Sequence, residues 1–125
     1  MPLSYQLLAS EQLIVISGTG DLTTTDIETI IRQIHADPQW EPTYDYLFDY
    51  RGIEGTSAPI KDVYRIVDQV SLYRDVLAGS YCAVVAPNLV IYGFARVFQT
   101  LVSGWEMKLA VFRSIEDAYF WLEKR

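Results

Sequence analysis

The chain has 125 residues, of which ten are Lys or Arg and sixteen are Asp or Glu, so its formal net charge is −6. Half of the residues are hydrophobic, which excludes a disordered chain, and the length predicts a single domain over residues 1–125. The acidic balance argues against nucleic acid and anionic membranes as partners, because both select clustered Lys and Arg.

The single cysteine, Cys82, cannot form an internal disulfide. Together with residues 1–6, which show no leader pattern, it indicates a reducing, cytoplasmic setting. Residues 76–95 carry no charge and are long enough to cross a bilayer. Because Gly79 and Pro87 interrupt them, we expect a buried strand, a turn and a helix there rather than a membrane span.

In the first half of the chain, short β-prone runs at residues 5–8 and 13–17 predict an N-terminal hairpin. A helix follows, with Thr23 and Thr25 as alternative caps and Asp37-Pro38 as its end. Residues 44–50 predict the third strand. The helix is indicated by isoleucines at helical spacing: Ile27, Ile30, Ile31 and Ile34.

In the second half, Pro59 marks the start of a helix, residues 81–86 predict a buried strand, and residues 89–103 predict a third helix. Residues 108–112 form a fifth strand, and Ser114 caps a last helix. The apolar arcs expected to face the core are Ile60, Val63, Ile66, Val67 and Val70, then Val90, Phe94, Val97, Phe98, Leu101 and Val102, then Ile115, Ala118, Tyr119 and Leu122.

The resulting order is β-β-α-β-α-β-α-β-α. It predicts an α/β fold with a single mixed, mainly parallel five-stranded sheet and helices on both faces. The opening hairpin supplies the antiparallel strand.

Several segments resemble the SpoIIAA-like family of small bacterial proteins, often described as STAS/SEC14-like. They are YCAVVAPN at residues 81–88, IYGFARVFQ at 91–99, VFRSIEDA at 111–118, LFDYRGI at 47–53 and Gly18-x-Gly-x-Leu22-Thr. The resemblance covers nearly the whole chain. It implies the SpoIIAA-like fold and a regulatory or binding role, with no catalytic activity.

The best-characterised STAS proteins are anti-sigma factor antagonists switched by a phosphorylated serine after the third strand. Counted from Asp49, the family's Asp-Ser pair falls at positions 57 and 58, where this chain has Ser57 and Ala58. The acidic residue is missing and the serine is displaced by one position. Ser57 therefore stands as a phosphate acceptor near a helix start or, alternatively, as an ordinary cap or loop residue.

Open α/β sheets bind ligands outside the carboxyl ends of their strands. That edge would carry Asp49, Arg51 and Asn88, together with Tyr50, Pro87, Arg113 and Ser114. Asp49 could coordinate a metal, but pairing with Arg51 is the expected role of a lone carboxylate beside a guanidinium.

Tyr92, Arg96, Gln99 and Ser103 form a polar stripe at helical spacing on the third helix. Arg96 could bind a carboxylate or phosphate of a partner or ligand. The alternative is an arginine stacked on Tyr92.

No catalytic, cofactor or metal site is expected. The loop at Gly18 and Gly20 lacks the third glycine of a dinucleotide fingerprint. His35 is the only histidine and has no companion ligands for zinc. Cys82 is expected to behave as a small buried hydrophobe.

The sequence therefore predicts a non-enzymatic regulatory or protein-interaction module with an unknown protein partner. The alternative is a binder of a small lipophilic or acidic ligand, held in a pocket between Ile60, Val63, Tyr64, Phe94 and Phe98. Nine tyrosines and three tryptophans also suggest a self-association face, so a homodimer is a further hypothesis.

Overall fold

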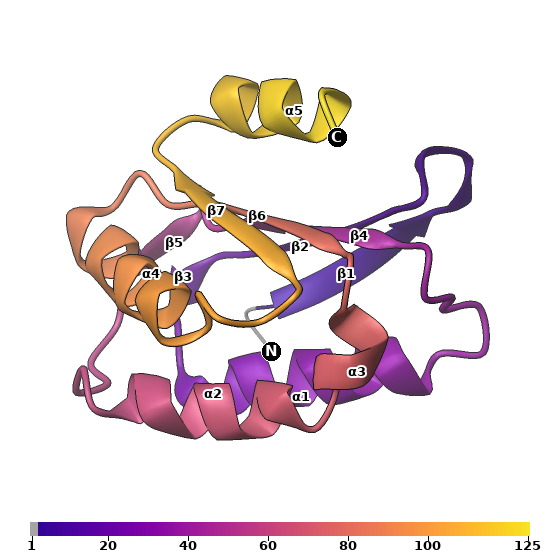
Figure 1. Cartoon of the computed structure of the whole chain (residues 1–125). Coiled ribbons are helices and arrows are strands. Elements are labelled where there is room, and N and C mark those ends of the chain that lie inside the picture. Colours follow the sequence, from indigo (N-terminus) through magenta and orange to yellow (C-terminus); the bar gives the residue numbers. More distant parts are fainter. Residues whose placement is uncertain (1–2) are drawn as a thin grey trace.

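A central sheet organises the chain, and the computed structural model describes residues 3–125 of it. The prediction made for residues 1–6 includes Met1 and Pro2, which lie outside the described residues. The strands lie in the order β1 (Leu3–Leu8), β2 (Leu13–Gly18), β4 (Asp45–Asp49), β6 (Tyr81–Val85) and β7 (Lys108–Phe112) (Figure 1). β1 is antiparallel to β2, across a short 3-10 helix at Ala9–Glu11, and the other neighbours are parallel. The mixed, mainly parallel sheet is confirmed.

The helices are divided unequally between the two faces of the sheet. α1 (Thr24–Ala36), α2 (Asp62–Ser71), α3 (Arg74–Leu77) and α4 (Leu89–Leu101) lie below it in Figure 1, and α5 (Ile115–Glu123) lies above it. Each parallel strand is added on the same side of its predecessor. Since such crossovers are right-handed, the connecting helices all fall on one face. Only α5, which follows the last strand, covers the other.

Side-chain caps fix where α1 and α5 begin. Thr23 Oγ1 accepts the Asp26 amide at 3.1 Å, which selects Thr23 over Thr25 as the α1 cap. Ser114 Oγ accepts the Asp117 amide at 3.2 Å, as the sequence predicts for α5. Residues 76–95 are divided among α3, β6 and α4, and within residues 3–125 none of the helices combines the length and the apolar character of a membrane span.

Two short strands that the sequence did not predict form a small parallel ladder: β3 (Gly20–Asp21) and β5 (Ile53–Gly55). The Leu22 amide continues this pairing by donating to the Gly55 carbonyl at 2.9 Å. The Thr56 hydroxyl donates to the Leu22 carbonyl at 2.7 Å. These contacts bring the segments before α1 and α2 side by side.

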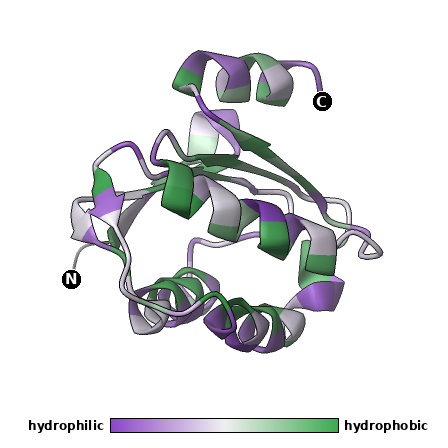
Figure 2. Cartoon of the chain, turned by 90° about the vertical axis from the view of Figure 1, so that its left-hand side faces the viewer, coloured by the Kyte–Doolittle hydropathy of each residue, from purple (hydrophilic) through white to green (hydrophobic). Residues whose placement is uncertain are grey.

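Three predicted helix faces are corrected by the structure. Ile60, expected to face the core from the second helix, is 50% exposed and precedes α2, which begins at Asp62 rather than at Pro59. In α4 the buried face is centred on Ile91 rather than Val90, whose side chain is 52% exposed. In α5, Tyr119 is 39% exposed instead of facing the core. Figure 2 shows hydrophobic colour on the sides of α1 and α2 that face the sheet, with hydrophilic colour on their outer sides.

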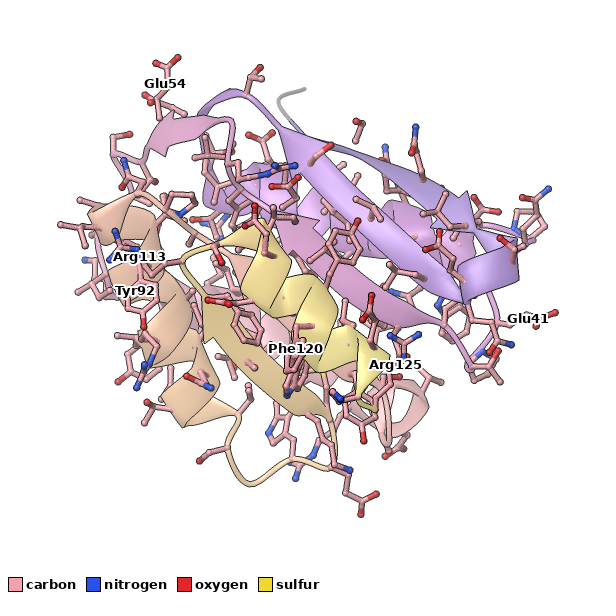
Figure 3. The ribbon with its side chains drawn as sticks, turned by 90° about the horizontal axis from the view of Figure 1, so that it is seen from above. Glu41, Glu54, Tyr92, Arg113, Phe120 and Arg125 are labelled. Atoms are coloured by element: carbon pink, nitrogen blue, oxygen red, sulfur yellow. The ribbon has the colours of Figure 1, made fainter. Side chains whose placement is uncertain are left out.

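The α5 face of the sheet, meaning the cluster that α5 covers, is small and closed. Its fully buried members are Leu13, Leu47, Ala83, Val85, Ala118 and Leu122. At its edge, Arg125 Nε lies 2.7 Å from Asp45 Oδ2, and Asp45 Oδ1 accepts the Tyr81 amide at 2.8 Å. Figure 3 shows the exposed Phe120 on α5 and Arg125 beyond the end of that helix. The carboxylate thus joins the chain's last residue to the sheet.

Candidate functional site

Asp49 and Arg51, at the end of β4, form a two-point ion pair with each other. Arg51 Nε donates to Asp49 Oδ1 at 2.9 Å, and Arg51 Nη2 donates to Asp49 Oδ2 at 2.8 Å. The hydrogen bonds from Arg51 lower the pKa of Asp49, and the same contact raises the pKa of Arg51. The expected pairing is observed, and residues 3–125 contain no group of three acidic, histidine or cysteine side chains arranged to hold a metal.

Asn88, a predicted binding residue, uses its side chain inside the fold. Its Oδ1 accepts the amides of Val90 and Ile91 at 2.9 and 3.2 Å, which caps α4. Its Nδ2 donates to the Glu54 carbonyl at 2.8 Å and so ties α4 to β5. This arrangement leaves Asn88 with a structural role.

Tyr92 lies between two arginines. Arg96 Nη1 donates to the Tyr92 hydroxyl at 3.2 Å, and the Arg96 and Arg113 guanidinium carbons lie 5.9 and 5.5 Å from the ring centroid. Arg113 also donates to the Pro87 carbonyl at 3.1 Å. Figure 3 shows Tyr92 and Arg113 side by side. Within residues 3–125, neither guanidinium has a carboxylate within 4.0 Å, so the Tyr92 cluster (Tyr92, Arg96 and Arg113) has two positive charges without acidic partners.

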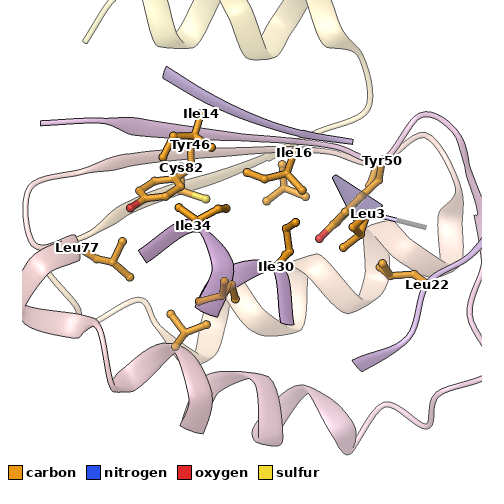
Figure 4. Packing of buried hydrophobic residues seen from close by; sticks show 14 of the residues in the cluster. Leu3, Ile14, Ile16, Leu22, Ile30, Ile34, Tyr46, Tyr50, Leu77 and Cys82 are labelled. Carbon is orange, nitrogen blue, oxygen red and sulfur yellow. The ribbon is translucent and has the colours of Figure 1, made fainter. Parts of the chain in front are cut away.

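An apolar cavity of about 130 Å³ lies on the other side of α4, between the sheet and the helices α1, α2 and α4. The backbone of α2 lies closer to α1 and α4 than to the sheet, and the cavity lies beneath it. Figure 4 shows several of its wall residues between the sheet and α1. The walls include Ile27, Ile31 and Ile34 of α1, Val63, Ile66 and Val70 of α2, Ile91, Phe94 and Phe98 of α4, and Phe48, Cys82 and Val84 of the sheet.

The sequence placed five residues around such a pocket, and three of them line it: Val63, Phe94 and Phe98. Ile60 and Tyr64 do not. Their side chains are 50% and 60% exposed. Tyr64 follows the buried Val63 by one position, which is about 100° around a helix, so it turns towards solvent when Val63 faces the cavity.

One end of the cavity is closed by a hydrogen-bonded aromatic cluster. His35 Nδ1 lies 2.8 Å from the Ile31 carbonyl, which can only accept, so Nδ1 carries the proton. Nε2 then accepts from the Tyr46 hydroxyl at 2.9 Å, and Trp40 Nε1 donates to that hydroxyl at 3.0 Å. The His35 ring also stacks on Tyr73 with centroids 4.3 Å apart.

This closed end holds its histidine neutral. Burial lowers the pKa of His35 and raises the pKa of Tyr46. Neither residue is predicted from the sequence to lie at a binding site. The available signal was the position of His35 four residues after Ile31, which puts it beside the apolar stripe of α1.

The opposite end of the cavity, its polar rim, consists of Thr23, Thr24, Thr56 and Asp62. The Thr24 hydroxyl donates to Asp62 Oδ2 at 3.3 Å. A shallow polar depression of about 200 Å³ adjoins this rim and adds the exposed Ser57 and Arg65. Arg65 is already paired, since its Nε donates to Glu28 Oε1 at 2.7 Å.

Cys82 lies in the cavity wall and is 4% exposed. Burial raises the pKa of its thiol to about 12, so it is protonated near neutral pH. A protonated, buried thiol is a poor nucleophile, and its expected behaviour as a hydrophobe agrees with its position. What the cavity can do is enclose an apolar group.

Comparisons with known proteins support the fold alone. Neither the protein-family models nor the curated proteins include a match. Among solved structures, the chain is similar to an uncharacterised protein of the DUF3478 family with a SpoIIAA-like fold from Shewanella loihica PV-4. The TM-score is 0.60 at 15% identity, over 96% of this chain and 91% of that one. The SpoIIAA-like fold that the sequence segments implied is confirmed.

Proposed function

We propose that this chain is a non-enzymatic binding protein for a small lipophilic ligand, which occupies the cavity under α2. The observation that supports it is an apolar space of about 130 Å³ in a domain whose other face is filled by α5. Protein interiors leave few voids larger than a water molecule. An apolar cavity of about 150 Å³ is known to stay dry and to bind benzene.

The energetics fit a modest affinity. Each buried methylene contributes about 0.8 kcal/mol, so six of them supply roughly 5 kcal/mol before the cost of association. Even without that cost, about 5 kcal/mol corresponds to a dissociation constant of about 0.2 mM, so we expect binding in the submillimolar to millimolar range for a six-carbon chain.

Native mass spectrometry of freshly purified protein tests the proposal. We expect the purified protein to carry a bound small molecule that organic solvent extracts. After extraction, we expect the protein to bind added 1-octanol. Ala95 lines the cavity, so Ala95→Leu should fill it and abolish both signals. Ala36→Leu adds the same atoms at an exposed position and should leave them unchanged. A protein that carries no adduct and does not bind 1-octanol contradicts the proposal.

The Tyr92 cluster favours a second candidate, a regulatory module that docks a protein partner. Arginine and tyrosine are enriched in protein interfaces, and a guanidinium without a partner can take a carboxylate of an acidic segment. Leu89, three positions before Tyr92, is 69% exposed and would add an apolar contact. We propose that the partner is another protein or a second copy of this chain. A cytoplasmic setting is proposed with it, because the single cysteine is free and buried.

A pull-down paired with light scattering tests this candidate. A stoichiometric partner that wild type captures and Arg96→Ala loses would support it. Arg32→Ala removes an exposed arginine of α1 and serves as the matched control. The candidate is contradicted if Arg96→Ala captures the partner as well as Arg32→Ala does. It is also contradicted if wild type captures no partner and is a monomer at tens of micromolar.

A further inference from the structure

We infer that the cavity takes a linear aliphatic chain with a hydrogen-bond-donating head group, a hydroxyl or an amine, and that the head lies at the polar rim beside Thr24 and Asp62. This inference rests on the proposed lipophilic-ligand function and names the class of ligand within it.

The shape of the cavity favours a chain over a compact ring. Its walls follow α1 from Thr24 to His35, and at a rise of about 1.5 Å per residue these residues lie roughly 16 Å apart along the helix. A volume of about 130 Å³ distributed over that length leaves a narrow passage. An extended alkyl chain can follow such a passage, whereas a bulky ring contacts only one part of it.

The closed end has no free hydrogen-bond donor for a ligand, and its polar groups are already bonded to one another. His35 Nδ1 donates to Ile31, Nε2 accepts from Tyr46, and the Tyr46 hydroxyl also accepts from Trp40. A polar head inserted here would break one of these bonds and leave a buried polar atom without a partner, which is costly. The methyl end of the chain therefore belongs at this end.

The polar rim offers an acceptor. Asp62 is half-buried, and its Oδ2 accepts from the Thr24 hydroxyl at 3.3 Å. Within residues 3–125 its Oδ1 receives no side-chain hydrogen bond, so it can accept one from a ligand hydroxyl or ammonium group.

The charges around the rim disfavour a carboxylate head. The N-terminus of α1 and Arg65 attract an anion, but Arg65 is held by Glu28 at 2.7 Å and by the Thr25 hydroxyl at 3.4 Å. The charge left to face the cavity is that of Asp62, which repels a second carboxylate. A neutral alcohol or an amine avoids this repulsion.

Isothermal titration calorimetry with three homologous series tests the inference on the full chain: 1-alkanols, 1-aminoalkanes and alkanoates from four to twelve carbons. We expect alkanol affinity to rise about fourfold per methylene, until the chain reaches Tyr46, and then to level off. Octanoate should bind at least about tenfold more weakly than 1-octanol. The variant Asp62→Asn should remove most of that difference, while Asp68→Asn, at an exposed position of the same helix, should preserve it.

Two results overturn the inference and leave the lipophilic-ligand function standing: cyclohexanol or 1-adamantanol binding as tightly as 1-octanol, or octanoate binding as tightly as 1-octanol to the wild type. Failure of every apolar probe, linear and compact alike, overturns the proposed function itself.

Discussion

The two faces of the sheet are covered in different ways, and the difference shows where the interior is closely packed and where it leaves space. On the α5 face, one helix lies directly on the strands and six side chains close the space completely. On the opposite face, the pocket face, α1 and α4 contact the two edges of the sheet and α2 bridges between them. The backbone of α2 lies closer to α1 and α4 than to the middle strands, and the cavity lies beneath it. Both faces bury side chains that stabilise the fold, and we propose that the space left on the pocket face takes a ligand.

The strand order explains why the pocket lies under the helices rather than at the strand ends. Ligand crevices in open α/β sheets form where the order of the strands reverses. Here the parallel strands follow one another in a single direction from β2 to β7, so no such reversal occurs. The residues predicted at that edge instead form the Asp49–Arg51 pair, the Asn88 cap and the Tyr92 cluster.

The largest expected effect is the loss of stability when a large side chain is truncated to alanine, which should differ between the two faces. Leu47 has no exposed surface and lies at the centre of the α5 face, so Leu47→Ala should lower the free energy of unfolding by about 2–5 kcal/mol. Ile66→Ala, in the half-buried roof of the cavity, should cost less than half as much. Urea unfolding followed by circular dichroism measures both. Equal losses would contradict the distinction between the faces.

Replacing an alanine by leucine on each face compares how much free space the two faces contain. Ala83 is fully buried on the α5 face, so Ala83→Leu should overpack it and lower the free energy of unfolding by about 1–3 kcal/mol. Ala95→Leu has empty space to enter and should change stability by less than about 1 kcal/mol. Thermal unfolding of the two variants gives the result, and a larger loss for Ala95→Leu would show that the cavity is not open to occupation.

Removing the contacts of Asp45 beside α5 should lower the free energy of unfolding by a smaller amount. Asp45→Ala leaves the Tyr81 amide without its acceptor and removes the partner of Arg125, at a cost of about 1–2 kcal/mol. Arg125→Ala should cost less, because the amide keeps its bond. Chemical unfolding of the two variants decides, and the reverse order would contradict this assignment.

The smallest expected effect is a pH dependence confined to the pocket face. Because burial lowers the pKa of His35 below 6.5, the unfolded chain binds a proton at higher pH than the folded chain does. The His35 contribution to stability is complete above pH 6.5 and declines as the pH falls from there. Asp49 also has a lowered pKa, and its contribution declines only below the usual carboxyl range. Unfolding curves between pH 7.5 and 5 should show the decline in wild type and not in His35→Phe; a slope that persists in the variant would assign it elsewhere.

The main elements of the fold could be predicted because their burial is periodic. The isoleucines of α1 and the continuous apolar run of β6 each specify one structure. β3, β5 and α3 could not be predicted, since they have between two and four residues and no repeating pattern. Tyr119 was assigned to the buried side of α5 although it is exposed. Tyrosine has an apolar ring and a polar hydroxyl, so the residue type does not tell which side of a helix it occupies.

The pocket was foreseen only in part. Helical spacing indicates which side chains face inward, and it correctly selected Val63, Phe94 and Phe98. It does not indicate whether a helix reaches the sheet or rests on its neighbours, and that is what creates the cavity under α2. The His35–Tyr46 contact and the approach of Arg113 to Tyr92 join residues from separate elements, and no local pattern reports them.

Methyl-resolved NMR titration with 1-octanol tests the central claim most directly, because it reads both faces of the sheet in one experiment. We predict saturable shifts of the Ile27, Ile31 and Ile34 methyl groups in the cavity wall and unchanged positions for Leu13, Leu47 and Leu122 under α5. Shifts of equal size on both faces, or an unperturbed set of isoleucine signals at saturating 1-octanol, would contradict the account.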